Sequence, residues 1–496
     1  MVWIDSVYIE NFRSIEKIAL KFHKMNALIG PNNAGKSNII KALSLVLGET
    51  YPSNRTFEEN HYFERDQSKV IKIDVIFDNY FTDPRSHNKV YGFRLESNNG
   101  NVNYVALNSM KQPLLYGTGT PIRVSQEMRD EIPLVYLDVD RQSAQQIRST
   151  QWTLYGKILK YIEKQIPEAK KIKFSQDVAN SFSSELFGVS TGSDLKSLED
   201  QLKNTIRDQT GFDLTLELSV LDPIEAIKNV RPYVKESSAA KKYDPEEMGA
   251  GTQSALTVSI ARAYSKIVRK SVILAIEEPE IHFHPQACRN LYNTFTDLSN
   301  NGLQIIYTTH SQSFVDISDF HSIHIVRKNM GSTTIESGLK LSTSGSLTKG
   351  KVVSKFNEHV NQALFADKVV LVEGPDDEIA CRAMLEKLGF DIFKNNVSVT
   401  SCGGKDNIPA IAEVLHSLGI ETVALMDEDS GSSATLNTRI KIEAILGKNG
   451  VLLQSPQLEG IFSYPTKFNQ ASALLFFGSF KGTPPGIYSD LLKKLT

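Results

Sequence analysis

Four acidic residues in the last quarter of the chain have the types and positions needed to bind divalent cations. Glu373 ends the apolar run KVVLV and Asp377 follows a Gly–Pro turn, while Asp427 and Asp429 close the apolar run TVALM. Parallel strands deliver their carboxyl ends to one edge of a sheet. Two unit charges 4 Å apart repel by about 4 kcal/mol at an effective dielectric near 20. Carboxylates gathered there must therefore take up protons or bind a hard cation such as Mg²⁺ or Mn²⁺. The alternative is that each acid caps a neighbouring helix or loop.

A second set of residues, near the start of the chain, could bind the phosphates of a nucleotide. Gly30 is followed after four residues by Gly35, Lys36 and Ser37. The glycines let backbone N–H groups surround phosphate, the lysine supplies a charge, and the serine hydroxyl can reach Mg²⁺. The apolar MNALI before this loop and SNIIKALSLVL after it predict strand, loop and helix. We expect ATP to contact further residues of the same loop, namely Asn32, Asn33 and Asn38.

Two later apolar runs predict strands that end at the same nucleotide. SVILAIE ends in Glu277 and Glu278, and LQIIYTT is followed by His310. We expect Glu277 to hold Mg²⁺ through water, Glu278 to polarise the attacking water, and His310 to sense the γ-phosphate. Arg13 and Arg141 could each be a phosphate contact or a structural ion-pair partner.

These motifs together resemble the ABC-type ATPases of the SMC, RecF and Rad50 group. The resemblance rests on IENFRSIEKIAL, the glycine-rich loop, GAGTQSAL, IEEPEIHFHP and TTHS. It implies that GAGTQSAL is the signature loop, which caps ATP on an opposing subunit. The matching positions are Gly249, Gly251, Thr252 and Gln253. The sequence of this loop departs from the common signature motif. Glu277 stands where the family has Asp. The glutamine-containing loop of the family has no identified counterpart in this sequence.

The C-terminal acids resemble those of the Toprim fold, and the order of the two motif sets resembles nucleases of the OLD (overcoming lysogenization defect) family. That resemblance implies two metals, a later Glu, matched by Glu459, and an assisting Lys, matched by Lys481 or Lys405. Glu373, Asp427 and Glu459 would share one metal, and Asp377 and Asp429 would support it or a second. The Gabija nuclease subunit and retron-associated nucleases share this layout, and the sequence leaves the choice of subfamily open.

The predicted fold class is α/β: an ABC-type P-loop ATPase with a helical insertion, followed by a Toprim, Rossmann-like domain. The predicted boundaries are residues 1–145 and 241–345 for the ATPase, 146–240 for an insertion that mediates dimerisation, and 346–496 for the Toprim domain. Alternation of strand-like and helix-like segments on both sides of the insertion predicts parallel sheets in both domains.

The composition places limits on partners and location. A formal net charge of −2 gives no global attraction to nucleic acid, so a polyanion would meet a local basic surface. The N-terminus has no signal-peptide pattern, no apolar run approaches the roughly 20 residues that cross a bilayer, and the three cysteines form no disulfide or metal pattern. We expect a cytoplasmic protein without membrane contact.

The resulting hypothesis is an ATP-regulated, metal-dependent endonuclease that forms a homodimer or larger homo-oligomer. We expect DNA rather than RNA as the substrate. A role in anti-phage defence, and an accessory defence protein or retron-type nucleic acid as a partner, follow from the resemblance alone. The main alternative is a DNA-repair or structural ATPase whose Toprim module binds nucleic acid without cutting it.

Overall fold

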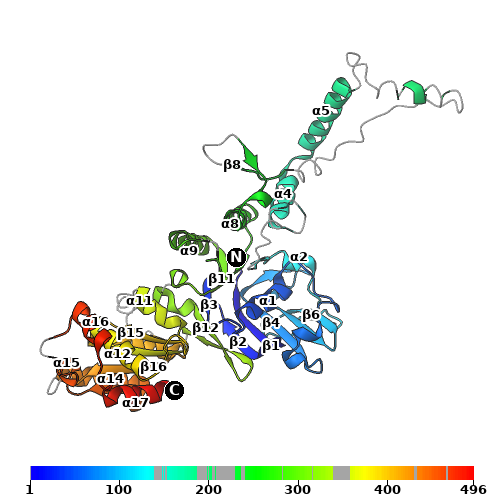
Figure 1. The fold of residues 1–496 in the computed structure, drawn as a ribbon. Coiled ribbons are helices and arrows are strands. Elements are labelled where there is room, and N and C mark those ends of the chain that lie inside the picture. Colours follow the sequence, from blue (N-terminus) through cyan, green and yellow to red (C-terminus); the bar gives the residue numbers. More distant parts are fainter. Residues whose placement is uncertain are drawn as a thin grey trace. The chain divides into compact units, whose positions relative to one another are not determined.

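The computed structural model is shown in Figure 1. It describes residues 2–138, 148, 150, 153–186, 198, 200–203, 207, 230–235, 241–281, 283–315, 317–338, 358–428, 433–464 and 467–496. The chain divides into two compact units, Met1–Val139 with Ser271–Thr496, and Asp140–Lys270. None of the helices in these described ranges combines the length and the apolar character needed to cross a membrane.

A six-stranded sheet carries the N-terminal motifs. Its order is β13-β12-β3-β11-β10-β7, and every pairing except β12 with β13 is parallel. The strands are β3 (Met25–Ile29), β7 (Leu134–Leu137), β10 (Val272–Glu277), β11 (Leu303–Thr309), β12 (Ile323–Asn329) and β13 (Ser332–Ser337). All residues of β3, β10 and β11 are buried, which explains their continuous apolar runs. The accompanying helices are α1 (Lys36–Leu47), α9 (Pro285–Asn300), η4 (Gln312–Phe314) and η5 (Ile317–Ser322).

A five-stranded antiparallel sheet, in the order β2-β1-β4-β5-β6, shares a hydrophobic core with α1. Its strands are β1 (Ile4–Phe12), β2 (Ile15–Lys21), β4 (Ile71–Thr82), β5 (Lys89–Asn98) and β6 (Asn101–Leu107). Short helices η1 (Glu59–His61) and η2 (Phe63–Arg65) precede β4 in sequence, and α2 (Gln126–Arg129) lies between β6 and β7. The prediction of a parallel sheet therefore holds for the sheet that carries the motifs, while the β-rich segments between residues 71 and 107 pair as antiparallel neighbours.

The described residues of the second unit are mainly helical. It contains α4 (Leu154–Gln165), α5 (Glu168–Leu186), α8 (Ala250–Val268), η3 (Pro245–Glu247) and a small ribbon of β8 (Val234–Lys235) and β9 (Lys242–Tyr243). Helix α4 packs against α8. Gly249 is the N-cap of α8, so the predicted signature loop leads directly into this helix. Helix α8 falls within the second unit, whereas the predicted boundaries assign residues 241–345 to the ATPase.

The C-terminal region forms a four-stranded parallel sheet in the order β15-β14-β16-β17. Its strands are β14 (Lys368–Val372), β15 (Val397–Ser401), β16 (Glu421–Asp427) and β17 (Val451–Gln454). The helices are α11 (Glu358–Asn361), η7 (Gln362–Phe365), α12 (Pro375–Lys387), η8 (Lys405–Asn407), α13 (Ile408–Ser417), α14 (Ser433–Leu446), η9 (Lys448–Gly450), α15 (Leu458–Ile461), α16 (Gln470–Ser479) and α17 (Gly486–Leu495). Helices α12, α16 and α17 contribute to a separate hydrophobic core with β14 to β17.

The β12–β13 hairpin contacts both the glycine-rich loop and the C-terminal sheet. On the first side, Thr333 donates a hydrogen bond from Oγ1 to the carbonyl of Ala34, at 2.9 Å. On the second side, Arg327 donates to the carbonyls of Gly419 at 2.5 Å and Ala366 at 3.4 Å. Gly419 and Ala366 lie two residues before the first residues of β16 and β14, the two strands that end at the predicted metal ligands.

Candidate active sites

The glycine-rich loop runs from β3 into α1, as the sequence predicts, and two glycines are required by its backbone. Gly30 has φ +152° and Gly35 has φ +110°. A Cβ on Gly30 would lie 1.9 Å from the carbonyl oxygen of Val326, and one on Gly35 would lie 2.2 Å from Thr333 Oγ1. No larger residue fits these positions without displacing the hairpin, so the loop keeps its N–H groups accessible next to the positive end of α1.

Lys36, the first residue of α1, is buried within the loop. Its Nζ donates to the carbonyls of Gly30 at 2.8 Å and Pro31 at 3.0 Å, and it lies 3.0 Å from Nε2 of His310. Burial lowers the pKa of Lys36, and the nearby carboxylates Glu278, Glu280 and Glu277 oppose that effect. The structure therefore brings together the lysine and the histidine that were predicted to contact phosphate.

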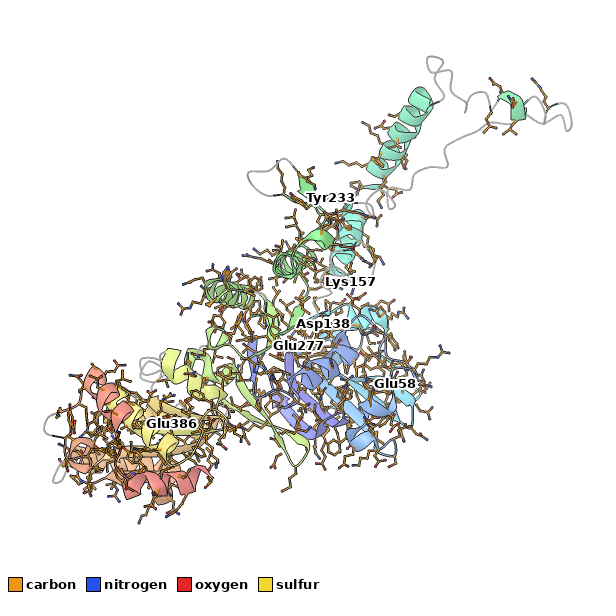
Figure 2. All side chains as sticks on the ribbon, in the orientation of Figure 1. Glu58, Asp138, Lys157, Tyr233, Glu277 and Glu386 are labelled. Carbon is orange, nitrogen blue, oxygen red and sulfur yellow. The ribbon has the colours of Figure 1, made fainter. Side chains whose placement is uncertain are left out.

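Glu277 is held from two sides at the end of β10. Ser37 donates from Oγ to Glu277 Oε2 at 3.0 Å, and Tyr136 donates from its hydroxyl to Oε1 at 2.7 Å. Tyr136 lies on β7, which pairs with β10, and Asp138 follows it; Figure 2 labels Glu277 and Asp138. Burial raises the pKa of Tyr136, and Glu277 raises it further, so the phenol keeps its proton. Tyr136 could not be predicted from the sequence, because its role depends on strand pairing.

Glu278 and His310 lie within reach of one another, with His310 Nε2 3.8 Å from Glu278 Oε1. A further acid, Glu280, was not predicted. Its Oε1 accepts hydrogen bonds from the backbone N–H of His310 at 2.6 Å and from Thr309 Oγ1 at 3.0 Å. Burial raises the pKa of Glu280 and lowers that of His310. Glu280 thus fixes the backbone position of His310.

The remaining predicted nucleotide contacts either contact other side chains or are exposed. Asn38 donates to Ser14 Oγ at 2.8 Å, and Asn32 and Asn33 are exposed on the loop. Arg13 contacts the imidazole of His61, with Nη2 3.2 Å from Nε2, so its role as a phosphate contact stays a prediction.

The signature positions and Arg141 complete the predicted set. Gly251 and Gln253 lie in the first turn of α8, in the second unit. There Gln253 donates to the carbonyl of Met248 at 2.9 Å. Arg141 lies outside the described residues.

In the C-terminal domain, Glu373, Asp377 and Asp427 meet at one edge of the sheet. Glu373 follows β14, and its Oε1 accepts the backbone N–H of Asp427 at 3.0 Å. Asp377 lies in the first turn of α12, and its Oδ2 accepts the N–H of Gly374 at 3.0 Å. Glu373 and Asp427 lie at the ends of the neighbouring strands β14 and β16, and Asp377 lies on the helix after β14, as predicted. Asp429 lies outside the described residues.

Gln454, at the end of β17, lies between two of these acids and was not predicted. Its Nε2 donates to Asp377 Oδ1 at 3.4 Å and to Asp427 Oδ1 at 3.3 Å. The same oxygen of Asp427 accepts the backbone N–H of Leu458 at 3.1 Å. Glu459, in α15, accepts the N–H of Phe468 at 3.0 Å. Gln454 was not predicted because its side chain is uncharged and so does not stand out beside the acids in the sequence.

The acids perturb one another strongly. The pKa of Asp427 rises to about 8, because of burial first and then the charges of Asp377 and Glu373, with Glu459 contributing. The pKa of Asp377 rises to about 6 through burial and the charge of Glu373. Asp376, a further acid that was not predicted, has its pKa raised by burial and by Glu459. The four predicted acids that the structure describes are therefore electrostatically one group.

This donor set fits a divalent cation. Carboxylate oxygens are the ligands that Mg²⁺ and Mn²⁺ prefer, and the mutual repulsion of buried carboxylates is relieved when a cation binds between them. Over the described ranges, no group of three or more His, Cys, Asp or Glu side chains already stands in metal-binding geometry.

The two candidate lysines occupy different surroundings. Lys405 donates to Thr435 Oγ1, at the start of α14, at 2.8 Å. Lys481 is exposed in the segment between α16 and α17. The identity of the assisting lysine stays a prediction for both.

Comparisons with known proteins agree with this arrangement. A family model described as "Overcoming lysogenization defect protein-like, TOPRIM domain" matches residues 364–429, and one described as "AAA ATPase domain" matches residues 3–116 and 126–315. The chain is 30% identical to the OLD nuclease of Thermus scotoductus, over 86% of this chain and 82% of that protein. It is 26% identical to Endonuclease GajA of Bacillus cereus (86% and 75%) and 23% identical to the Old nuclease of Escherichia phage P2 (88% and 78%).

The fold and the two sites define an ABC-type P-loop ATPase fused to a Toprim domain, a class that uses a nucleotide and a divalent metal. The chain belongs to the OLD nuclease family. An ATPase-coupled nuclease is accordingly better supported than a repair ATPase that binds nucleic acid without cutting it.

Proposed function

We propose that this protein hydrolyses phosphodiester bonds of nucleic acid at the Toprim edge, with Mg²⁺ or Mn²⁺ held by Glu373, Asp377, Asp427, Asp429 and Glu459. The observation that carries this proposal is the environment of Asp427. Its carboxyl group is largely buried and lies beside other carboxyls, and burial first and then the charges of Asp377 and Glu373 raise its pKa to about 8. A protein gains stability by removing such a charge unless the charge serves to bind a cation.

The chain's own groups would position the reaction. The N–H groups of Gly374 and Leu458 fix the carboxylates of Asp377 and Asp427, so their free lone pairs have defined directions. When bound, the cations would activate water and neutralise the leaving oxygen of an in-line displacement. Lys481 or Lys405 would contact a phosphate oxygen and stabilise its negative charge.

ATP would bind across the glycine-rich loop, with Lys36 on its phosphates and Ser37 and Glu277 on Mg²⁺. Glu278 would orient the attacking water, and His310 would contact the γ-phosphate. Gly251 and Gln253 would cap the nucleotide of a second copy, which makes a homodimer or a larger homo-oligomer part of the proposal. The insertion, residues 146–240, would hold the copies together.

Nucleotide binding would control cleavage through the β12–β13 hairpin. Val326 and Thr333 contact the glycine-rich loop, and Arg327 holds the backbone before β14 and β16. Arg327→Ala should leave ATP turnover and nucleotide-free cleavage within about threefold of wild type but reduce the effect of ATP on cleavage. An unchanged response to ATP would contradict this route.

A cleavage assay tests the central function. Plasmid, single-stranded DNA and RNA would be incubated with wild type or Asp427→Ala, in Mg²⁺, in Mn²⁺ and in EDTA. We expect wild type to cut DNA in preference to RNA, only with a divalent cation, and the variant to lose at least about 100-fold of that activity. Equal products from both proteins would remove the nuclease assignment.

The biological role and the domain limits extend the same proposal. The proposed role is protection of bacteria against phage, with an accessory protein or a retron-type nucleic acid as a further partner. Plating efficiency of phage on cells with wild type and with Asp427→Ala would measure it.

Limited proteolysis would test the proposed domain limits, which are residues 1–145 and 241–345 for the ATPase and residues 346–496 for the Toprim domain.

A further inference from the structure

The amide of Gln454 makes three hydrogen bonds within the Toprim core. Its two N–H groups face Asp377 Oδ1 at 3.4 Å and Asp427 Oδ1 at 3.3 Å. Its Oε1 accepts the hydroxyl hydrogen of Tyr488 at 3.1 Å. Gln454 and Tyr488 are 1% and 0% exposed, so water does not compete for these groups.

Tyr488 holds the amide in this orientation. An ionised carboxylate oxygen only accepts hydrogen bonds, so the two acids require the N–H groups to face them, and the phenol, which can donate or accept, donates to the remaining amide oxygen. Rotating the amide by half a turn would place its oxygen against the two carboxyl groups. Tyr488 lies on α17, which packs against β17 and α12, so its ring position is set by the core rather than by the acids.

The backbone of Gln454 also positions the end of β16. Gln454 pairs with Asp427 in the register of β16 and β17, and its carbonyl accepts the N–H of Glu428 at 2.8 Å. Its backbone therefore fixes the end of β16, while its side chain reaches Asp377 on α12. One buried residue joins the two acids that come from different elements.

We propose that Gln454, oriented by Tyr488, is a positioning residue that sets the directions of the Asp377 and Asp427 carboxyl groups for a divalent cation. This inference rests on the proposed metal-dependent function. The competing interpretation is that the amide only satisfies buried acids in the metal-free protein and has no effect on cation binding.

Two variants separate these interpretations. Gln454→Leu removes both donors, and Tyr488→Phe keeps the ring but removes the group that orients the amide. Removing an outer hydrogen-bond partner of a metal ligand typically weakens metal binding by about 10–100-fold. We therefore expect the dissociation constant of Mn²⁺ to rise by at least about tenfold in Gln454→Leu and by a smaller factor in Tyr488→Phe.

The matched control is Thr422→Val. Thr422 is buried at the opposite end of β16, where its Oγ1 donates to the carbonyl of Ile420 at 2.9 Å. This variant loses one buried side-chain hydrogen bond on the same strand without touching the acids. Its thermal midpoint should fall while its Mn²⁺ affinity stays at the wild-type value.

The experiment is a titration of the full chain with Mn²⁺, without nucleotide, in which electron paramagnetic resonance measures the free ion. All variants would carry Lys36→Ala and Glu277→Ala, so that the Toprim ions dominate, and circular dichroism would verify folding. Absence of Mn²⁺ binding in this parent, or equal binding by Asp427→Ala, would refute the proposed function itself. Binding lost with Asp427→Ala but unchanged in folded Gln454→Leu would overturn the role of Gln454 alone, and binding weakened in Gln454→Leu but unchanged in folded Tyr488→Phe would overturn the role of Tyr488.

Discussion

Replacement of Asp427 by Asn should stabilise the metal-free protein while abolishing its response to Mg²⁺. The change keeps the shape of the side chain and an oxygen that can accept the N–H of Leu458, but it removes the charge that Asp377 and Glu373 repel. Stability and metal binding should therefore move in opposite directions, a result that a purely structural aspartate would not give.

The magnitude follows from the pKa of Asp427. Its rise from 3.8 to about 8 corresponds to a ceiling of about 6 kcal/mol at 1.36 kcal/mol per pKa unit. Because the side chain is only partly buried, solvent screening reduces the expected gain to about 2 kcal/mol at pH 8. The folded state binds more protons at this site than the unfolded state does, so the contribution to stability is fully present below pH 3.8 and is lost as pH rises through about 8.

The assay is thermal unfolding of wild type and Asp427→Asn in EDTA and in Mg²⁺, at pH 6 and pH 8. We expect the variant to melt roughly 4–8 °C higher in EDTA at pH 8, with a smaller difference at pH 6. Mg²⁺ at 100 times its dissociation constant should stabilise wild type by about 2.7 kcal/mol and leave the variant unchanged. Asp490→Asn, an exposed acid paired with Lys493, is the control and should shift neither value. A variant that is less stable than wild type in EDTA at pH 8 would refute the electrostatic reasoning.

Three further predictions concern the ATPase sheets. Lys36→Ala should reduce ATP turnover by at least about 100-fold, because it removes the charge placed on the phosphates; full turnover in a steady-state assay would mean that the loop is not the nucleotide site. Tyr136→Phe should raise the Mg²⁺ concentration needed for half-maximal ATP binding, measured with a fluorescent nucleotide, by about tenfold, since Glu277 Oε1 loses its donor. Unaltered Mg²⁺ dependence would show that Ser37 alone positions Glu277. His324, whose pKa burial lowers to about 3, should make stability fall as pH drops below 6.5, by about 2 kcal/mol at pH 5. The urea midpoints of wild type and His324→Gln between pH 7 and pH 5 measure this loss of stability. The same pH dependence of the midpoint in both proteins would contradict the prediction.

The features that could be predicted from the sequence are those with a local pattern. The strand, glycine-rich loop and helix around Lys36 follow from glycine spacing and apolar runs, and the tips of β14 and β16 follow from acids that end such runs. Buried parallel strands can be recognised in a sequence without knowing which strands they pair with, because both of their faces are apolar.

The residues that were missed depend on pairing over long sequence distances. Tyr136 reaches Glu277 only because β7 lies beside β10, and Gln454 reaches Asp377 only because β17 completes the sheet next to β16. Neither residue carries a charge, so neither stands out by composition. Glu280 and Asp376 do carry charge, but each adjoins a stronger candidate, and only the folded contacts distinguish them.

Anomalous diffraction from crystals of the full chain soaked in Mn²⁺ would test the proposed cation site most directly. A peak in coordinating distance of Asp427 and at least one of Glu373 and Asp377 is the predicted result. Cleavage that persists in Mn²⁺ while this edge of the sheet shows no peak would contradict the assignment of these acids as metal ligands.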